Sequence, residues 1–476
     1  MVNLDSKSLL RCASVSRSLY LTFHSSSLLQ YMAQLALYGM EDTGSDLSYP
    51  DISSLLRDHQ RAWELLDWKR TVTIEFPAYC QAYELVAGVF ARSDGKNLKI
   101  FGLPSRTDDG YTIIRTPDIQ FLEFAIEPTQ DVVAFLELSR HLTQRIHLRN
   151  ISTNAPLGIL SFTIHPSHIF RPILHFADDR LGLHYTSRIL IWNWQQGSLI
   201  LDSSRENLPH PFSDFVFLSR DAFLVTTTAL HVYVFNPPSS AILVSTLHLP
   251  MTRNHSLSPQ ITVHSGPLHA RPPAGALFTP SSRERIQVLS LEYGLDLKYT
   301  MFVHTNTLSR YIERYRNGQA APQLDVPWDL WGPHGTRFMK HDVPRTWLGY
   351  AHGQRMIQKR DTESGTEIDV IDFNYVPSSS ALSEPPVNTH PCPIGDNNVR
   401  RTTFARSQPT VLPPSTSTVF SGSGSDSPFI TEVVTSLPYH VSSVSLPLSF
   451  YAFMIDDERV IGVQVDESDI KLTVRL

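Results

Sequence analysis

Three short segments of the chain alternate apolar side chains with other residues and then stop at an asparagine. They are residues 146–150, 189–193 and 232–236. Such alternation is the pattern of a half-buried strand, and asparagine favours the turn that follows a strand. Each final asparagine lies 43 residues from the next one. The spacing indicates a repeat that is built from short strands.

A repeat of about 40–45 residues made of short strands is typical of a β-propeller blade. Residues 98–102 look like an earlier copy of the same segment, and more strand patterns lie between and after the copies. These further segments are 71–76, 119–126, 132–138, 169–176, 181–185, 223–227, 286–293, 297–304, 368–373, 430–435, 451–455, 459–465 and 470–474. We therefore predict a mainly β fold, a propeller of about six to eight blades that closes by joining its last strands to its first.

The first 68 residues have helical periodicity instead. Asp5 is placed to cap a helix that carries Leu9 and Leu10, and serines 25–27 precede a second apolar helix face that ends near Gly39. A third helical stripe opens at Asp51. The predicted fold thus has a short α-helical N-terminus before the strands.

Composition narrows the classes of function. The chain has 476 residues, of which 41% are hydrophobic and 18% charged, and its net charge is -6. No basic field favours nucleic acid, and no run of about 18 apolar residues predicts a membrane span. Charged residues interrupt the N-terminal apolar stretches, so no signal peptide is expected. The three cysteines, Cys12, Cys80 and Cys392, are far apart and indicate a reducing compartment. We expect an intracellular protein, cytoplasmic and/or nuclear.

Candidate chemistry is sparse. The sequence has no phosphate-loop, zinc-protease or nucleophile-elbow motif, so we predict no catalytic residue, no cofactor and no metal site. The histidines clustered between 141 and 184 are interpreted as loop and core residues, and Trp192 and Trp194 as blade packing. The acidic run 456–458 is interpreted as a hairpin turn with solvated charges, and the pair Arg400–Arg401 is a weak candidate for anion binding.

One stretch near the N-terminus carries a family resemblance. Leu4-Asp5, then Leu9-Leu10-Arg11-Cys12-Ala13-Ser14-Val15-Ser16-Arg17 and Leu19-Tyr20, resembles the second half of an F-box. Ser16 stands where that family usually has cysteine, and the Leu-Pro helix that opens a complete F-box has no counterpart after Met1, so part of the motif is expected to be lost or missing. Residues 28–31, 39–40 and 63–68 are similar to fungal F-box proteins that continue into a propeller-like region.

Two later stretches extend the resemblance. The segment 191–197 is similar to the strand and turn of a WD-like blade, and 437–439 with 454–459 is similar to the last blade of those fungal proteins. The resemblance implies a non-catalytic substrate receptor that binds a Skp-family adaptor and joins a cullin–RING ubiquitin ligase. It also implies the adaptor-binding residues, with apolar anchors and one rim contact: Leu4, Leu9, Leu10, Val15 and Arg17. The protein target is not identified.

The resulting organisation has three parts. Residues 1–40 form a partial F-box-like helical segment, residues 41–68 a helical linker, and residues 69–476 a propeller-like domain. A mobile insertion rich in serine and proline is expected at 376–428. Two alternatives stay open, a propeller scaffold with no ubiquitin-ligase role and, last, a propeller enzyme.

Overall fold

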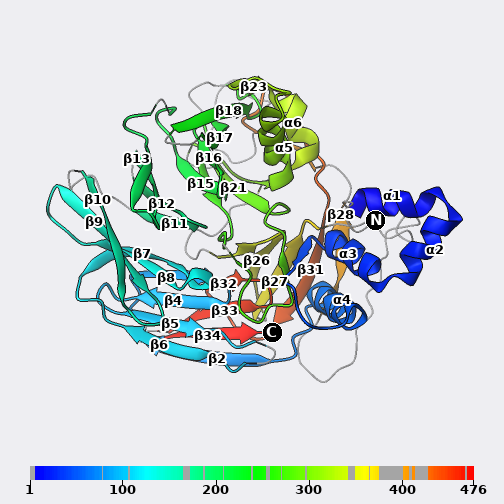
Figure 1. Ribbon diagram of the computed structural model, residues 1–476, viewed down its shortest axis with the longest axis horizontal. Helices are drawn as coiled ribbons and strands as arrows, with labels where there is room; N and C mark the ends of the chain where they lie inside the picture. The colour runs from blue at the N-terminus through cyan, green and yellow to red at the C-terminus, as the bar shows by residue number, and fades with distance from the viewer. Residues whose placement is uncertain are drawn as a thin grey trace.

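Antiparallel sheets follow one another along most of the chain and close into a ring (Figure 1). The structure is a computed structural model. It describes residues 6–77, 79–105, 108–164, 172–185, 188–206, 208–236, 240–253, 258–269, 271–294, 297–340, 349–363, 365–374, 400–406, 410–412, 427–466 and 469–476. Inner strands of consecutive sheets contact each other from β3 through β7, β11 and β15 to β19, and β25 contacts β21 on one side and β32 on the other. This is the arrangement of a β-propeller, as predicted.

The described residues form seven blades, within the predicted six to eight, numbered here from the inner strand outward in chain order. Blade 1 is β3 Ala82–Val86, β4 Val89–Ser93, β5 Leu98–Gly102 and β6 Tyr111–Arg115; blade 2 is β7 Phe121–Glu127, β8 Val132–Glu137, β9 Thr143–Asn150 and β10 Pro156–Thr163; blade 3 is β11 Ile173–Ala177, β12 Arg180–Tyr185, β13 Arg188–Asn193 and β14 Ser198–Asp202; blade 4 is β15 Asp214–Ser219, β16 Ala222–Thr226, β17 Ala229–Asn236 and β18 Ser240–His248.

The last three blades are less regular. Blade 5 is β19 Gln260–His264, β21 Ile286–Tyr293, β22 Leu297–His304 and β24 Thr336–Met339; blade 6 is β25 Ala351–His352, β26 Arg355–Thr362, β27 Gly365–Asp372, β31 Tyr439–Leu446 and β28 Arg400–Arg406; blade 7 is β32 Ala452–Ile455, β33 Val460–Val465, β34 Asp469–Arg475 and β2 Thr71–Pro77. Here helices and longer loops interrupt the spacing that the first blades keep.

The 43-residue repeat corresponds to the third strand of consecutive blades. β9, β13 and β17 end at Asn150, Asn193 and Asn236, and the earlier copy is β5. In blade 3 the amide of Asn193 donates to Asp179 in the turn between β11 and β12, at 2.9 Å. In blade 2 the amide of Asn150 donates to Asp131 in the matching turn, at 3.2 Å. The asparagines therefore tie the third strand of these two blades to the first turn.

Ring closure joins the two ends of the propeller, as predicted. β2 pairs with β34 in an antiparallel register from Thr71 opposite Arg475 to Pro77 opposite Asp469. Phe76 of β2 is buried with Phe90 and Phe101 of blade 1, so the closing strand also belongs to the core between blades 7 and 1. Similar apolar clusters lie between the other blades, for example around Phe121 and Phe135 between blades 1 and 2. Hydrophobic burial between blades is the main stabilising term of the ring.

In the described part of the chain four helices precede the ring, α1 Ser6–Val15, α2 Arg17–Ser25, α3 Ser27–Leu37 and α4 Tyr49–Leu65. Serines cap three of them, since Ser16, Ser26 and Ser48 accept the backbone N–H of the third residue that follows. Ser48, one turn before the predicted Asp51, begins α4, and Gly39 follows α3 with a positive φ of 62°. α2 was not predicted. The helices lie beside β28 and β31 of blade 6 (Figure 1).

Two insertions hold most of the remaining elements. The segment between β22 and β24 of blade 5 holds α5 Thr305–Arg316, β23 Leu324–Val326 and α6 Trp328–Gly335, and β23 pairs in parallel with β18 at the outer edge of blade 4. The range expected as a mobile loop, 376–428, contains β28, paired with β31, and β29 Thr410–Leu412, paired with β30 Val433–Thr435. Backbone pairing therefore continues inside that range where it is described, and the rest of it lies outside the described residues. A short strand pair, β1 Met40–Asp42 with β20 Phe278–Pro280, links the helices to blade 5.

Candidate functional site

The F-box-like residues occupy different positions on the helices. Leu4 lies outside the described residues. Leu9 is fully buried in a small core with Ala13, Phe23 and Leu29. Leu10 is 49% exposed and Val15 is 75% exposed, and Arg17 at the start of α2 is exposed as well. The structure thus separates the predicted set into one internal residue and three surface residues.

More apolar side chains of the helices are exposed. Tyr20 and Leu21 of α2 are 50% and 56% exposed. A hollow between the helices is lined by Leu10, Phe23, His24, Gln30, Ala33, Gln34 and Leu37. We call α1, α2 and α3 with this hollow the helical surface. Ser16, which replaces the usual cysteine of the family, has a local reason to be there, because its hydroxyl accepts the Leu19 N–H at 3.2 Å and caps α2.

Helix α4 fixes the helices to the ring. His59 Nε2 lies 2.9 Å and Trp63 Nε1 3.2 Å from the carbonyl oxygen of Asp457, in the turn between β32 and β33. On blade 6, Arg355 donates to Gln60 Oε1 at 2.9 Å and to Asp372 at 2.8 Å. The indole of Trp63 is buried in the apolar core of blade 6. These contacts join α4 to two blades at the face of the ring that carries the turn between each blade's first and second strands, named here the first-turn face.

The acidic run 456–458 differs from its prediction. It does form the turn between β32 and β33, and Glu458 is exposed as predicted, but Asp456 and Asp457 are not solvated. Asp456 is buried and binds Arg459 at 2.9 Å, and Asp457 pairs with His352 of β25. The His352 and His269 imidazoles hold the pKa of Asp457 well below its ordinary value against the opposing effect of burial. The turn contacts α4 through the Asp457 carbonyl oxygen, and Asp456 and Asp457 lie enclosed there.

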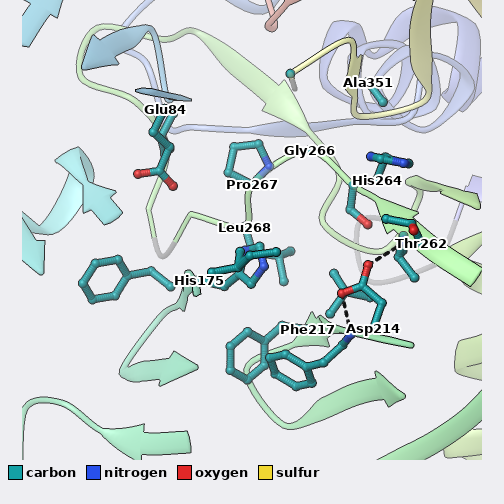
Figure 2. A pocket seen from close by; sticks show the side chains of 18 of the residues that line it. Glu84, His175, Asp214, Phe217, Thr262, His264, Gly266, Pro267, Leu268 and Ala351 are labelled. Atoms are coloured by element: carbon teal, nitrogen blue, oxygen red, sulfur yellow. Dashed lines mark hydrogen bonds between the residues drawn. The ribbon is translucent and has the colours of Figure 1, made fainter. Parts of the chain in front are cut away.

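The centre of the ring contains a cavity of about 160 Å³. Its wall comes from the inner strands of six blades, and Figure 2 shows Glu84 of β3, His175 of β11 and Asp214 of β15 around it, with Pro267 and Leu268 among them. Apolar side chains make up most of the remaining wall: Val86, Ile126, Ile173, Phe176, Phe215, Val216, Phe217, Val263, Tyr350 and Ala351. We call this space the channel cavity.

The polar groups of the channel cavity differ in their hydrogen-bond partners. Asp214 accepts the backbone N–H of Phe215 and of Val263, each at 2.8 Å, and its Oδ1 lies 3.4 Å from His184 Nδ1. Glu84 accepts the Ile126 N–H through one oxygen, at 2.6 Å. Burial raises the pKa of Glu84 well above its ordinary value and lowers the pKa of His175 to about 4. Sequence spacing could not reveal this group, because its members come from different blades.

Other candidate residues have structural roles where the structure describes them. Trp192 is buried in the core of blades 2 and 3, as predicted, and Trp194 donates to the Asp178 carbonyl at 2.9 Å. His147 pairs with Glu137 at 2.9 Å. His165 and His168 lie outside the described residues, and Arg400 and Arg401 are described only as backbone of β28. No group of three or more His, Cys, Asp or Glu is placed to hold a metal in the part of the chain that the structure describes.

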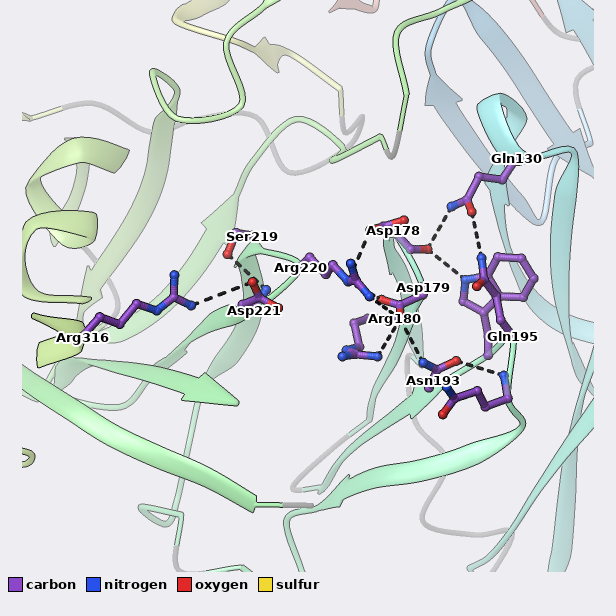
Figure 3. Close-up of polar contacts among 12 residues, drawn as sticks. Gln130, Asp178, Asp179, Arg180, Asn193, Gln195, Ser219, Arg220, Asp221 and Arg316 are labelled. Carbon is purple, nitrogen blue, oxygen red and sulfur yellow. Dashed lines mark hydrogen bonds and ion pairs between the residues drawn. The ribbon is translucent and has the colours of Figure 1, made fainter. Parts of the chain in front are cut away.

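A polar network crosses blades 2, 3 and 4 on the first-turn face (Figure 3). Asp179 accepts hydrogen bonds from Nε and Nη2 of Arg220, at 2.9 and 3.0 Å, and a third from Arg180 at 3.0 Å. Gln130 of blade 2 donates to the Asp178 carbonyl at 2.9 Å. The network sets the relative position of three neighbouring blades.

Comparisons with known proteins add likenesses of fold. No protein-family model matches this chain, and no curated protein matches its sequence. Among solved structures, a chain of a mitotic checkpoint complex is 9% identical, with 85% of this chain and 94% of that chain covered and a TM-score of 0.35. Hsv2p of Kluyveromyces lactis is 10% identical, with 62% and 92% covered and a TM-score of 0.31. Function is therefore inferred below from the residues of this chain.

No helix among the described residues combines the length and the apolar character that crossing a membrane requires.

Proposed function

We propose that this chain is a non-catalytic interaction protein of the F-box type. Its helical surface binds a Skp-family adaptor of an intracellular cullin–RING ubiquitin ligase, and its propeller holds a protein target. The observation that carries the proposal is the exposure of Leu10 and Val15, two apolar residues of the F-box-like stretch, on helices that are fixed to the ring. Exposed apolar residues that gather on one surface mark interaction sites.

Leu10, Val15, Tyr20 and Leu21 supply the apolar anchors of the proposed contact, and Arg17 supplies a charged rim. Leu9 supports this surface from inside, since its side chain is fully buried against Phe23 and Leu29. The proposed role of Leu4 in adaptor binding rests on the sequence resemblance alone.

The proposed mechanism is proximity. A target on the propeller is held near the ubiquitin-transfer machinery on the helices, which raises its effective concentration there. A fixed orientation of the helices relative to the propeller keeps the effective concentration of the target high and reproducible. The contacts of His59 and Trp63 with Asp457, and of Gln60 with Arg355, supply this fixed orientation.

A second candidate function is a propeller scaffold without a ligase role, in which the helices are a structural cap. The burial of Leu9 favours it, because one of the two motif leucines serves internal packing. The two functions differ in what the exposed leucine does. Only the first requires Leu10 in a contact with an adaptor.

Calorimetric titration of the chain with a purified Skp-family adaptor tests the proposal. We expect binding by the wild type and a loss of at least tenfold in affinity for Leu10→Glu and for Val15→Glu, because each places a charge in an apolar contact. Both side chains are exposed, so the variants retain the fold. Leu138→Glu, 55% exposed on the propeller, is the matched control and keeps wild-type affinity.

Equal adaptor binding by the wild type and both helical variants would contradict the proposed surface. A wild type that does not bind, but binds once an F-box first helix is added upstream, would retain the surface and require a longer chain. Absence of binding in both forms would favour the scaffold.

A further inference from the structure

The channel cavity is closed at one end by the segment 265–268, which follows β19. Ser265 donates to Gln287, and the Gly266 carbonyl accepts from Arg285. A side chain at Gly266 would meet the Ala351 carbonyl oxygen at 2.9 Å, so the backbone passes tightly against β25. Leu268 packs against the apolar cluster of blades 3 and 4. These contacts hold the segment in place as the floor of the cavity, on the first-turn face.

The other end of the cavity lies where inner strands begin. Ile173 and Asp214 line the cavity and are the first residues of β11 and β15. Ile173 is 37% exposed. Since inner strands run from this face toward the first-turn face, the described residues place the more exposed end of the cavity on the face opposite α4.

The wall of the cavity is acidic. Its lining residues include the carboxylates of Glu84 and Asp214 and the imidazoles of His175 and His264, and they include no lysine or arginine. Asp214 is satisfied by two backbone N–H groups and lies next to His184. The second oxygen of Glu84 and both nitrogens of His175 have no hydrogen-bond partner within the described part of the chain. Two acceptor groups deep in the ring are therefore free to meet a ligand (Figure 2).

A buried carboxylate is stabilised when a cation compensates it. Burial raises the pKa of Glu84, and the neighbouring Glu123 and Glu127 raise it further. The described residues around Glu84 therefore favour its neutral form, although the Ile126 N–H opposes this effect. A cation brought by a ligand would favour the carboxylate.

We propose that the channel cavity binds a guanidinium or ammonium group on an aliphatic stem, the cation donating to Glu84 and His175 and the stem lying against the apolar wall. The volume of about 160 Å³ is small beside the ~300–1,000 Å³ of pockets for drug-sized molecules, so it suits a single side chain or a small amine. The site rests on the propeller alone and does not depend on the proposed adaptor contact.

Ligand-observed NMR titration of the full chain tests the site with n-butylguanidinium and its neutral isostere n-butylurea. We expect the cation to bind and the urea to bind at least tenfold more weakly. Glu84→Gln keeps an acceptor for the Ile126 N–H but removes the charge, and we expect it to weaken n-butylguanidinium by at least tenfold. Glu75→Gln, on the exposed side of β2, is the control and leaves the affinity unchanged.

A second variant distinguishes a loss of binding from a loss of the fold. Ile173→Trp at the exposed mouth is expected to block n-butylguanidinium while the ring stays folded by circular dichroism. A pentapeptide with a central arginine, compared with the same peptide carrying citrulline, then shows whether the bound cation belongs to a protein side chain or to a small molecule. Binding of the arginine peptide points to a partner's side chain, and binding of the small cation alone points to a free amine. Equal binding of cation and urea, or full affinity in folded Glu84→Gln and Ile173→Trp, would overturn the proposal.

Discussion

The guanidinium carbon of Arg355 lies 4.8 Å from the centroid of the Trp63 ring. Arg355 begins β26 in blade 6, and Trp63 belongs to the last turns of α4. The same guanidinium also binds Asp372 and Gln60, so its charge is paired while its flat face covers the indole. One arginine therefore connects α4 to the ring through two contacts, with Trp63 and with Gln60, while Asp372 of the same blade pairs its charge.

Replacing Trp63 by alanine is expected to lower the free energy of unfolding by about 3–5 kcal/mol, the usual cost of removing a buried aromatic side chain. Trp63 is 8% exposed, and its loss also removes the hydrogen bond to the Asp457 carbonyl. Urea denaturation followed by far-ultraviolet circular dichroism measures the change.

Leu65→Ala is the control for this measurement. Leu65 lies two residues further along α4 and is 45% exposed, so its truncation is expected to cost about 0.5 kcal/mol or less. Equal midpoints for the two variants would show that α4 is not fixed to the ring through Trp63.

Asp179 is the centre of the network on blades 2 to 4. Its replacement by alanine is expected to cost about 3 kcal/mol, the lower end of the range for a broken buried pair, because its partner Arg220 is half-exposed. Arg180, Asn193 and Arg220 all lose an acceptor in this variant. Thermal or urea denaturation of Asp179→Ala against the wild type gives the difference.

Asp221 provides the matched comparison. Its carboxylate is 57% exposed and lies 3.9 Å from Arg316, so Asp221→Ala is expected to cost about 0–1 kcal/mol. If Asp179→Ala were as mild as Asp221→Ala, the network would not set the positions of the blades.

His231 gives a pH dependence. Burial lowers its pKa to about 4, with His248 adding to the shift and Asp325 opposing it. Its ring meets Thr227 at 2.8 Å and Thr246 at 3.3 Å. An unfolded histidine has a pKa of about 6.5. Between pH ~6.5 and ~4 the unfolded state therefore binds the extra proton, and stability falls as the pH is lowered through this window.

His231→Gln is expected to reduce that pH dependence by about one proton, because glutamine does not titrate. His175 and His269, whose pKa values burial also lowers to about 4, act in the same direction and remain in the variant. Urea midpoints of both proteins at several pH values between 4 and 7 give the two slopes. Parallel curves would contradict the expectation.

Most of the ring could be predicted from local pattern. β21 and β22 have the predicted bounds, 286–293 and 297–304, because both are rich in apolar and aromatic residues over eight positions and Gly294 marks the turn after β21. The 43-residue spacing identified third strands because blades 2 to 4 have short turns that keep the chain length per blade constant. Blade 6 does not keep the 43-residue spacing, because the segment between β27 and β31 is long.

Several helices were missed for physical reasons. α2 is only nine residues long and exposes Tyr20 and Leu21, so its apolar stripe is weak, although Ser16 could have indicated its start. α5 carries Leu308, Tyr311 and Ile312 at helical spacing inside a strand-rich region, where it went unnoticed. A cap residue followed by that spacing would have found both.

The two candidate sites differ in how much of each could be predicted from the sequence. The F-box-like stretch is contiguous, so its residues were named in advance, but the burial of Leu9 beside the exposure of Leu10 depends on how α1, α2 and α3 pack. The channel cavity is the opposite case. Glu84, His175 and Asp214 come together only when inner strands of different blades are arranged in a ring.

The pairing of β2 with β34 has a consequence for the protein during its synthesis. Thr71 of β2 is translated before every other strand of the ring, whereas its partner Arg475 belongs to the strand of the ring that is translated last. Blade 7 therefore stays open until the rest of the ring has been made, with β2 as an unpaired edge that other chains could join. A premature stop after Val465 would leave β2 without its partner strand for good, so truncated products should aggregate or be degraded.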